Sequence, residues 1–107
     1  MFTLHRATAP NLASRSPAAA NAAGLHTICF LVEGVAECGV LARVLEQFAK
    51  RDLLPHRIAA DVAPDGGPLE INLQVPGLTL EDGYQIARGL RGIVGVSAVL
   101  TSTKEYR

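Results

Sequence analysis

The chain alternates between apolar and polar positions from about residue 25 to residue 103, and the spacing changes from segment to segment. From Thr27 to Glu33 the spacing is that of a β-strand, in which successive side chains point to opposite faces. One face carries Ile28, Phe30 and Val32. The other face carries Cys29 and Leu31, so the strand is apolar on both sides. This pattern predicts a central strand whose second face is also covered.

The segment from Gly39 to Arg51 has the spacing of an amphipathic helix. Its apolar stripe consists of Val40, Leu41, Val44, Leu45 and Phe48. Pro55 prevents the helix from continuing, because proline lacks the N–H group that the helix requires.

A second helix is predicted from Thr79, a suitable N-cap residue, to about Arg91. Its predicted buried face consists of Leu80, Tyr84, Ala87 and Leu90, with Ile86 beside it. Gly83 and Gly89 each weaken an isolated helix by up to about 1 kcal/mol relative to alanine. A close approach of this helix to the sheet would account for these glycines.

Three further strands are predicted over about Arg57–Ala63, Leu69–Val75 and about Val96–Thr103. Residues 64–68, PDGGP, join the first two as a hairpin connection. In the last strand, alternation places Val96, Ala98 and Leu100 on one face. It places Ser97, Val99 and Thr101 on the other.

The predicted order is strand, helix, strand, strand, helix, strand. Two helices cover only one face of a four-stranded antiparallel sheet, which gives an α+β two-layer sandwich of the ferredoxin-like βαββαβ type. Residues 1–24 contain no acidic side chain and are rich in Ala, Ser, Pro and Asn. We expect a flexible N-terminal extension over 1–24 and a single domain over 25–107.

Composition and charge exclude several classes of function. Ten basic residues balance ten acidic ones, so the charge gives no case for nucleic acid or an anionic membrane. The open face of the predicted sheet offers no aromatic side chain on which RNA bases could stack. We expect no membrane span, no metal site and no cofactor. The two cysteines, Cys29 and Cys38, indicate reduced thiols in a cytoplasmic protein.

The segment from Glu33 to Val44 is the best-defined candidate for a ligand site. A strand-to-helix turn leaves the first helical N–H groups without intrahelical partners, and the helix dipole favours an anion there. The N–H groups of Gly39, Val40 and Leu41 could receive a carboxylate, and Glu37 or loop carbonyls could receive an ammonium group. Alternatively, Gly39 only permits the turn and Glu37 only complements the helix dipole.

The run ECGVLARVLEQFAKRDLLPHRI, after a strand ending in LVE, resembles an ACT domain. It is most similar to the first ACT domain of the regulatory (small) subunit of acetolactate synthase. The resemblance implies binding of an amino acid or a similar small metabolite, usually at a subunit interface, and regulation of an enzyme. The ligand-binding residues that it implies are Ala36, Glu37, Cys38, Gly39, Val40 and Leu41.

The sequence departs from that resemblance at two positions. Ala36 occupies the place of an Asn in the acetolactate synthase subunits, and Cys38 that of a common proline. Loss of the Asn amide removes a donor and an acceptor. The sequence therefore leaves two functions open. One is a small stand-alone regulatory domain, and the other is an interaction module with a degenerate effector site.

We expect a homodimer or higher oligomer, and possible association with a metabolic enzyme. The apolar second face of the first strand, with Val99 beside Cys29 and Leu31, would otherwise remain exposed. No enzyme activity is expected, because the sequence contains no paired carboxylates, nucleophile elbow or phosphate loop. The histidines His5, His26 and His56 are scattered along the chain.

Overall fold

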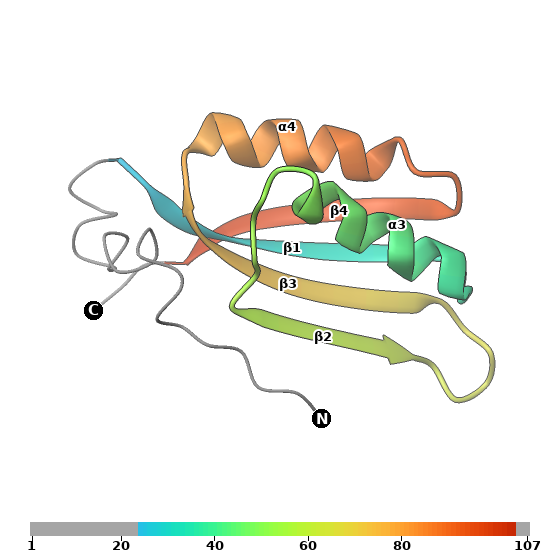
Figure 1. Cartoon of the computed structure of the whole chain (residues 1–107). Helices are drawn as coiled ribbons and strands as arrows, with labels where there is room; N and C mark the ends of the chain where they lie inside the picture. Colours follow the sequence, from blue (N-terminus) through green and yellow to red (C-terminus); the bar gives the residue numbers. More distant parts are fainter. Residues whose placement is uncertain (1–23, 105–107) are drawn as a thin grey trace, which may run out of the picture.

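The computed structural model describes residues 24–104 as a sheet with two helices on one face (Figure 1). The elements are β1 (His26–Gly34), α3 (Cys38–Ala49), β2 (Arg57–Val62), β3 (Leu69–Leu78), α4 (Leu80–Arg91) and β4 (Val96–Lys104). The strands are antiparallel and lie in the order β2-β3-β1-β4. The predicted ferredoxin-like order is confirmed. The predicted N-terminal extension lies outside the described residues, except for Gly24.

The core lies between the sheet and the helix layer, with β1 at its centre. Phe30 of β1 meets Phe48 of α3 edge to face, with ring centroids 5.4 Å apart. This arrangement is favoured by the aromatic quadrupoles. Every element except β2 contributes buried apolar side chains. These are Ile28, Phe30, Val32, Val40, Val44, Phe48, Leu69, Ile71, Leu73, Val75, Leu78, Ile86, Ala87, Leu90, Val99 and, from the α4–β4 connection, Ile93.

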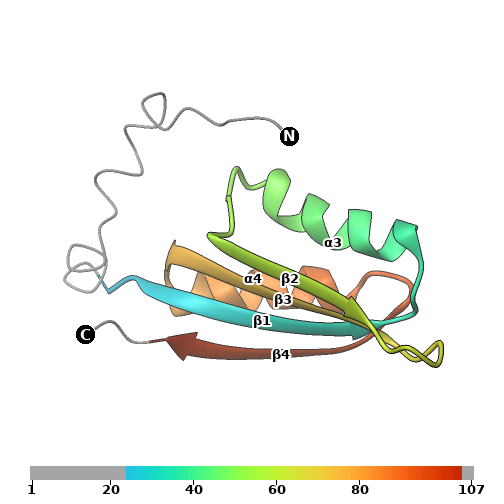
Figure 2. The same cartoon turned by 90° about the horizontal axis from the view of Figure 1, so that it is seen from below.

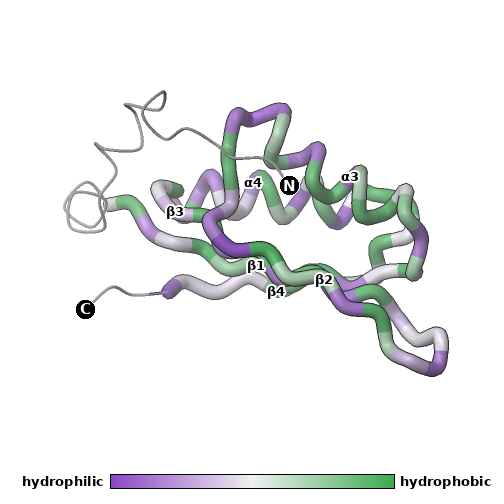
Figure 3. Tube along the Cα trace, turned by 60° about the horizontal axis from the view of Figure 1, so that its bottom comes forward, coloured by the Kyte–Doolittle hydropathy of each residue, from purple (hydrophilic) through white to green (hydrophobic). Residues whose placement is uncertain are grey.

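Strand β2 is an edge strand in which every residue is exposed, although apolar residues lie along it (Figure 3). Ile58 lies opposite Leu73 and Val62 opposite Leu69, so both side chains are on the helix side of the sheet. They nevertheless remain 47% and 52% exposed. The helix layer therefore leaves the apolar side of β2 half uncovered.

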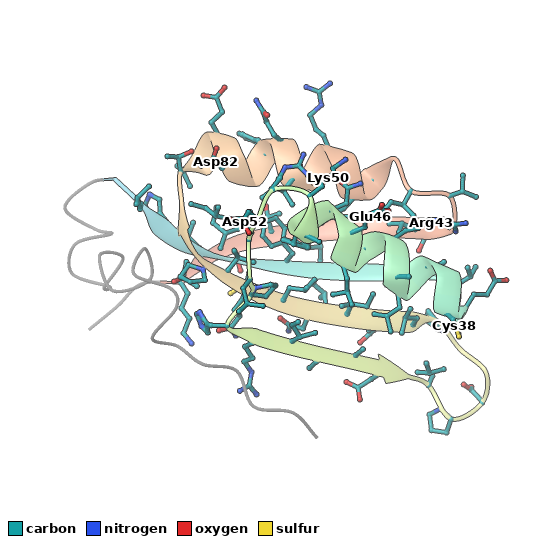
Figure 4. The ribbon with its side chains drawn as sticks, in the orientation of Figure 1. Cys38, Arg43, Glu46, Lys50, Asp52 and Asp82 are labelled. Atoms are coloured by element: carbon teal, nitrogen blue, oxygen red, sulfur yellow. The ribbon has the colours of Figure 1, made fainter. Side chains whose placement is uncertain are left out.

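Helix α3 has the predicted apolar stripe and begins one residue earlier than predicted, at Cys38. Val40, Val44 and Phe48 are buried, and Leu41 and Leu45 are partly buried against the core. On the exposed side lie Arg43, Glu46 and Lys50, labelled in Figure 4.

The start of α4 is fixed by the predicted cap. The Asp82 N–H donates to Thr79 Oγ1 at 3.0 Å, and the Thr79 N–H donates to Asp82 Oδ2 at 3.2 Å. This is a reciprocal capping box, which satisfies two N–H groups that a helix start would leave free.

The predicted buried face of α4 is partly wrong. Tyr84 is 71% exposed and Leu80 is also exposed, whereas Gly83, Ile86, Ala87 and Leu90 are buried. The reason is Gly83. A Cβ atom there would lie 2.5 Å from Ile28 Cδ1, so the missing side chain lets α4 approach the sheet on this face.

The predicted faces of β4 are also wrong. Val32 pairs with Val99 and Glu33 with Ala98, but Gly34 pairs with Val96, so Ser97 is an extra residue in β4. Such a β-bulge reverses which side chains face the core. Val99 is therefore buried at 5% exposure, and Leu100 lies beside Leu31 on the open face.

The face of the sheet opposite the helices, the open face, consequently carries Leu100 next to Leu31 and Cys29. Val99, which was predicted there, is on the helix side. Its exposed or partly exposed members are Cys29, Leu31, Glu33, Arg57, Ala59, Asp61, Glu70, Asn72, Gln74, Ala98, Leu100, Ser102 and Lys104. No aromatic side chain is among these described residues. No helix within residues 24–104 has the length and apolar character needed to cross a membrane.

The revised face of α4 can be tested by truncating one side chain from each face. Ile86→Ala removes a buried side chain and is expected to lower the free energy of unfolding by about 2–5 kcal/mol. Tyr84→Ala alters an exposed side chain and is expected to change it by at most about 0.5 kcal/mol. Chemical denaturation of both variants measures the difference. A larger loss for Tyr84→Ala would contradict this helix orientation.

Candidate functional site

The β1–α3 connection is held against the α4–β4 connection by a close backbone contact. The Val35 N–H donates to the Gly95 carbonyl oxygen at 2.8 Å. A Cβ atom on Gly34 would lie 2.5 Å from that same oxygen, and Gly95 has a φ of 102°. Both positions therefore require glycine, one for space and the other for its backbone conformation.

These connections border an open hollow at one end of the sheet, with a volume of about 480 Å³. The β2–β3 connection lies at the same end and completes it (Figure 1). The lining residues are Gly34, Val35, Ala36, Glu37, Gly66, Gly67, Pro68, Gly95 and Ser97. The volume is in the range of small-molecule sites, and the lining is dominated by small side chains and backbone.

The structure brings only part of the predicted site to this hollow. Ala36 and Glu37 line it. Cys38, Gly39, Val40 and Leu41 form the start of α3 behind it, where Val40 is buried in the core. Cys38 is labelled in Figure 4 at the end of α3 that faces the β2–β3 connection.

The free backbone donors differ from those expected. The N–H groups of Val40 and Leu41 both donate to the Glu37 carbonyl oxygen, at 3.1 and 3.4 Å. Helix α3 starts at Cys38, one residue earlier than predicted. Cys38 and Gly39 therefore supply its first two N–H groups, which have no hydrogen-bond partner within the described residues. These two groups are the donors that α3 presents toward the preceding loop.

Gly39 is not the residue that shapes this turn. It lies in the first turn of α3, and a Cβ atom added there would only reach ordinary contact with Arg43 Nη1, at 3.4 Å. The turn depends instead on Gly34 and Gly95. The sequence interpretation missed them because their contact joins positions that are far apart in the chain.

Glu37 is the N-cap residue of α3, but its side chain makes no capping hydrogen bond. Its exposed carboxylate is therefore available at the rim of the hollow. Ser97 is already engaged, because its Oγ donates to the Glu33 carbonyl oxygen at 3.1 Å. Glu37 is thus the charged group of the hollow, and the remaining polar groups come mainly from the backbone.

The described residues offer no alternative built on metal chemistry. Within residues 24–104, no group of His, Cys, Asp and Glu side chains is arranged to hold a metal ion. Cys29 and Cys38 are both free thiols.

A second, smaller hollow of about 210 Å³ lies between α4 and β4. It is lined by Ile28, Leu80, Gly83, Tyr84, Thr101, Ser102 and Thr103. The sequence interpretation did not anticipate it, because Leu80 and Tyr84 were assigned to the core. It has no charged lining residue, so the first hollow is better suited to a polar metabolite.

Comparisons with known proteins identify the type of domain. A family model described as an ACT-like domain matches residues 21–106. No curated protein matches the chain.

The fold is similar to that of two solved domains. The ACT domain from the GTP pyrophosphokinase of Chlorobium tepidum is 19% identical, with a TM-score of 0.63 over 73% of this chain and 99% of that one. The C-terminal domain of the MgtC protein from Mycobacterium tuberculosis is 20% identical, with a TM-score of 0.61 over 78% and 92%. At these identities the likeness establishes the shared fold.

The contribution of the glycine contact can be tested with a matched pair of substitutions. Gly34→Ala forces the new methyl group against the Gly95 carbonyl and is expected to cost about 1–3 kcal/mol of unfolding free energy. Gly39→Ala meets no such obstacle and should be neutral or stabilise by up to about 1 kcal/mol. Equal effects of the two substitutions in urea denaturation would show that the contact does not constrain the loop.

Proposed function

Because the chain belongs to the family of ACT-like domains, we propose that it is a non-catalytic regulatory domain acting in the cytoplasm. It binds an amino acid or a similar small metabolite and thereby modulates a partner enzyme. The observation that carries this proposal is the hollow bounded by the β1–α3, β2–β3 and α4–β4 connections.

Groups of both signs lie in or beside the hollow, since Glu37 lines it and the start of α3 follows directly in the chain. The free N–H groups of Cys38 and Gly39, at the positive end of the α3 dipole, suit a carboxylate. The Glu37 carboxylate, which makes no capping bond, suits an ammonium group. The small lining residues leave room for a side chain of modest size.

A second candidate is an interaction module similar to the acetolactate synthase small subunit, in which the effector site is degenerate. Ala36 favours it, because a methyl group lines the hollow where those subunits have an Asn amide. In this case the domain binds protein partners, and the hollow has no ligand.

A thermal-shift screen with the common amino acids and related metabolites distinguishes the two candidates. A ligand at 100 times its dissociation constant stabilises the folded state by about 2.7 kcal/mol. For a domain of this size, we expect the melting temperature to rise by about 10 °C or more. Unchanged melting for every compound, with a well-folded protein, would support the interaction module instead.

A matched pair of substitutions locates the ligand. Glu37→Gln removes the charge proposed to bind the ammonium group. We expect it to raise the dissociation constant of a bound amino acid by about tenfold or more. Glu81→Gln makes the same change on the exposed first turn of α4 and should leave the affinity unchanged. Isothermal titration calorimetry measures both. Equal affinities for Glu37→Gln and the unaltered protein would exclude the proposed position of the ammonium group.

A further inference from the structure

The hollow between α4 and β4 lies at the other end of the sheet from the first hollow. It has a volume of about 210 Å³. Ile28, near the start of β1, lines it, whereas the first hollow lies where β1 ends at Gly34. The two hollows share no lining residue. An occupant of the second hollow would therefore be independent of the proposed function.

This hollow exists because α4 does not cover the second half of β4. Thr103 lies opposite Ile28, so its side chain is on the helix side of the sheet, as is that of Thr101 two residues earlier. Both threonines are exposed, whereas Val99 on the same side is buried. Strand β4 is also the outer strand of the sheet on the side away from α3 (Figure 2). No described element therefore covers the hollow from this edge.

One wall of the hollow consists of apolar side chains that the core does not use. Leu80 and Tyr84 are four residues apart, so they lie on the same face of α4, one turn from each other. They are 55% and 71% exposed. The buried Ile28 approaches Gly83 closely, and these two residues close the hollow toward the core. A ligand that covers this wall would remove apolar surface from water.

The side-chain polar groups that line the hollow are all hydroxyls. The hydroxyls of Tyr84, Thr101 and Thr103 have no hydrogen-bond partner within residues 24–104. A hydroxyl both donates and accepts, so it suits a neutral polar group. No charged side chain lines the hollow, so an ion would find no counter-charge there. The lining therefore favours a neutral ligand.

The volume limits the ligand to about one ring. Sites for drug-sized ligands have about 300–1,000 Å³, and an apolar cavity of about 150 Å³ holds benzene. We propose that this hollow binds a neutral phenol, a class of molecule that keeps its proton at pH 7 because its pKa is about 10. Its ring packs against Ile28, Leu80 and Tyr84. Its hydroxyl group bonds to Thr101 or Thr103.

A protein partner fits this hollow less well than a small molecule. A stable protein interface involves about 20–30 residues on each side. The exposed large apolar residues at the hollow are Leu80 and Tyr84 alone. The exposed charged residues Glu81 and Arg88 flank them on α4. The exposed apolar surface is thus confined to the hollow itself.

Titration of the full chain with p-cresol, followed by nitrogen-15 NMR, tests the site. We expect the backbone amide signals of residues 83–84 and 101–103 to shift along one saturable curve, with a dissociation constant of about 1 mM or below. Benzoate carries a negative charge on the same ring and should bind at least about tenfold more weakly. The amide signal of Gly95, at the first hollow, should not respond. Absence of saturable shifts, or equal binding of benzoate, would overturn the proposal.

Truncation of Tyr84 tests the ring contact. Tyr84→Ala should raise the dissociation constant of p-cresol by about tenfold or more, because it removes one apolar wall. Leu54→Ala is the matched control, since Leu54 is also an exposed apolar residue, at 64%, in the α3–β2 connection. It should leave the affinity unchanged. Equal affinities of the two variants would contradict the proposed position of the ring.

Removal of the threonine hydroxyls tests the hydrogen bond. The double variant Thr101→Val, Thr103→Val changes the shape of the hollow little and should raise the dissociation constant of p-cresol by about fivefold. Toluene lacks the hydroxyl group, so its affinity should be the same in the double variant and the unaltered protein. Equal losses for the two ligands would show that no such hydrogen bond forms.

Two measurements without ligand test for other occupants. Deletion of residues 1–23 should leave the amide signals of residues 83–84 and 101–103 unchanged, and so should dilution of the protein. A shift on deletion would assign the hollow to the N-terminal segment of the same chain. A shift on dilution would assign it to a second copy. Either result would overturn the proposal.

Discussion

The structure depends on the burial of one face of the central strand, β1. This strand uses both edges for hydrogen bonding, to β3 and β4, and its Phe30 lies under Phe48 of α3. The edge-to-face ring contact fixes α3 on the sheet, and Ile28 beside Gly83 fixes the approach of α4. Strand β2, by contrast, contributes no side chain to this buried core.

The candidate site also depends on the central position of β1, at the end of the sheet where β1 leads into α3. Once β1 and β4 are paired, the Gly34–Gly95 contact draws the loops that follow β1 and precede β4 together. The hollow lies beside that contact, and the hairpin glycines complete its wall. Its polar groups are largely backbone groups, so the fold itself determines its shape, with Glu37 as a charged addition.

The fold could be predicted from the sequence because each helix or strand has a pattern of apolar and polar residues, or a capping residue, within its own segment. The apolar stripe of α3, the Thr79 cap and the alternation in β3 were all confirmed. The faces of α4 and β4 were wrong for reasons that involve distant residues, Ile28 above Gly83 and the bulge opposite Glu33. The site shows the same limit. Ala36 and Glu37 follow β1 directly, whereas Gly66, Gly95 and Ser97 join them only through the tertiary structure.

The bulge at Ser97 also determines what the deletion of a residue from β4 would do to the fold. The alternation of side chains between the two faces of the sheet shifts by one residue at the bulge. Val96 and Val99 therefore both point toward the core, although three positions separate them. Removing the extra residue would make β4 regular. If Val96 kept its place, the side chains that follow in β4 would then move to the opposite face of the sheet, and Val99 would lose its place in the core. The length of this short segment is therefore part of the folding information, as much as the identity of its side chains.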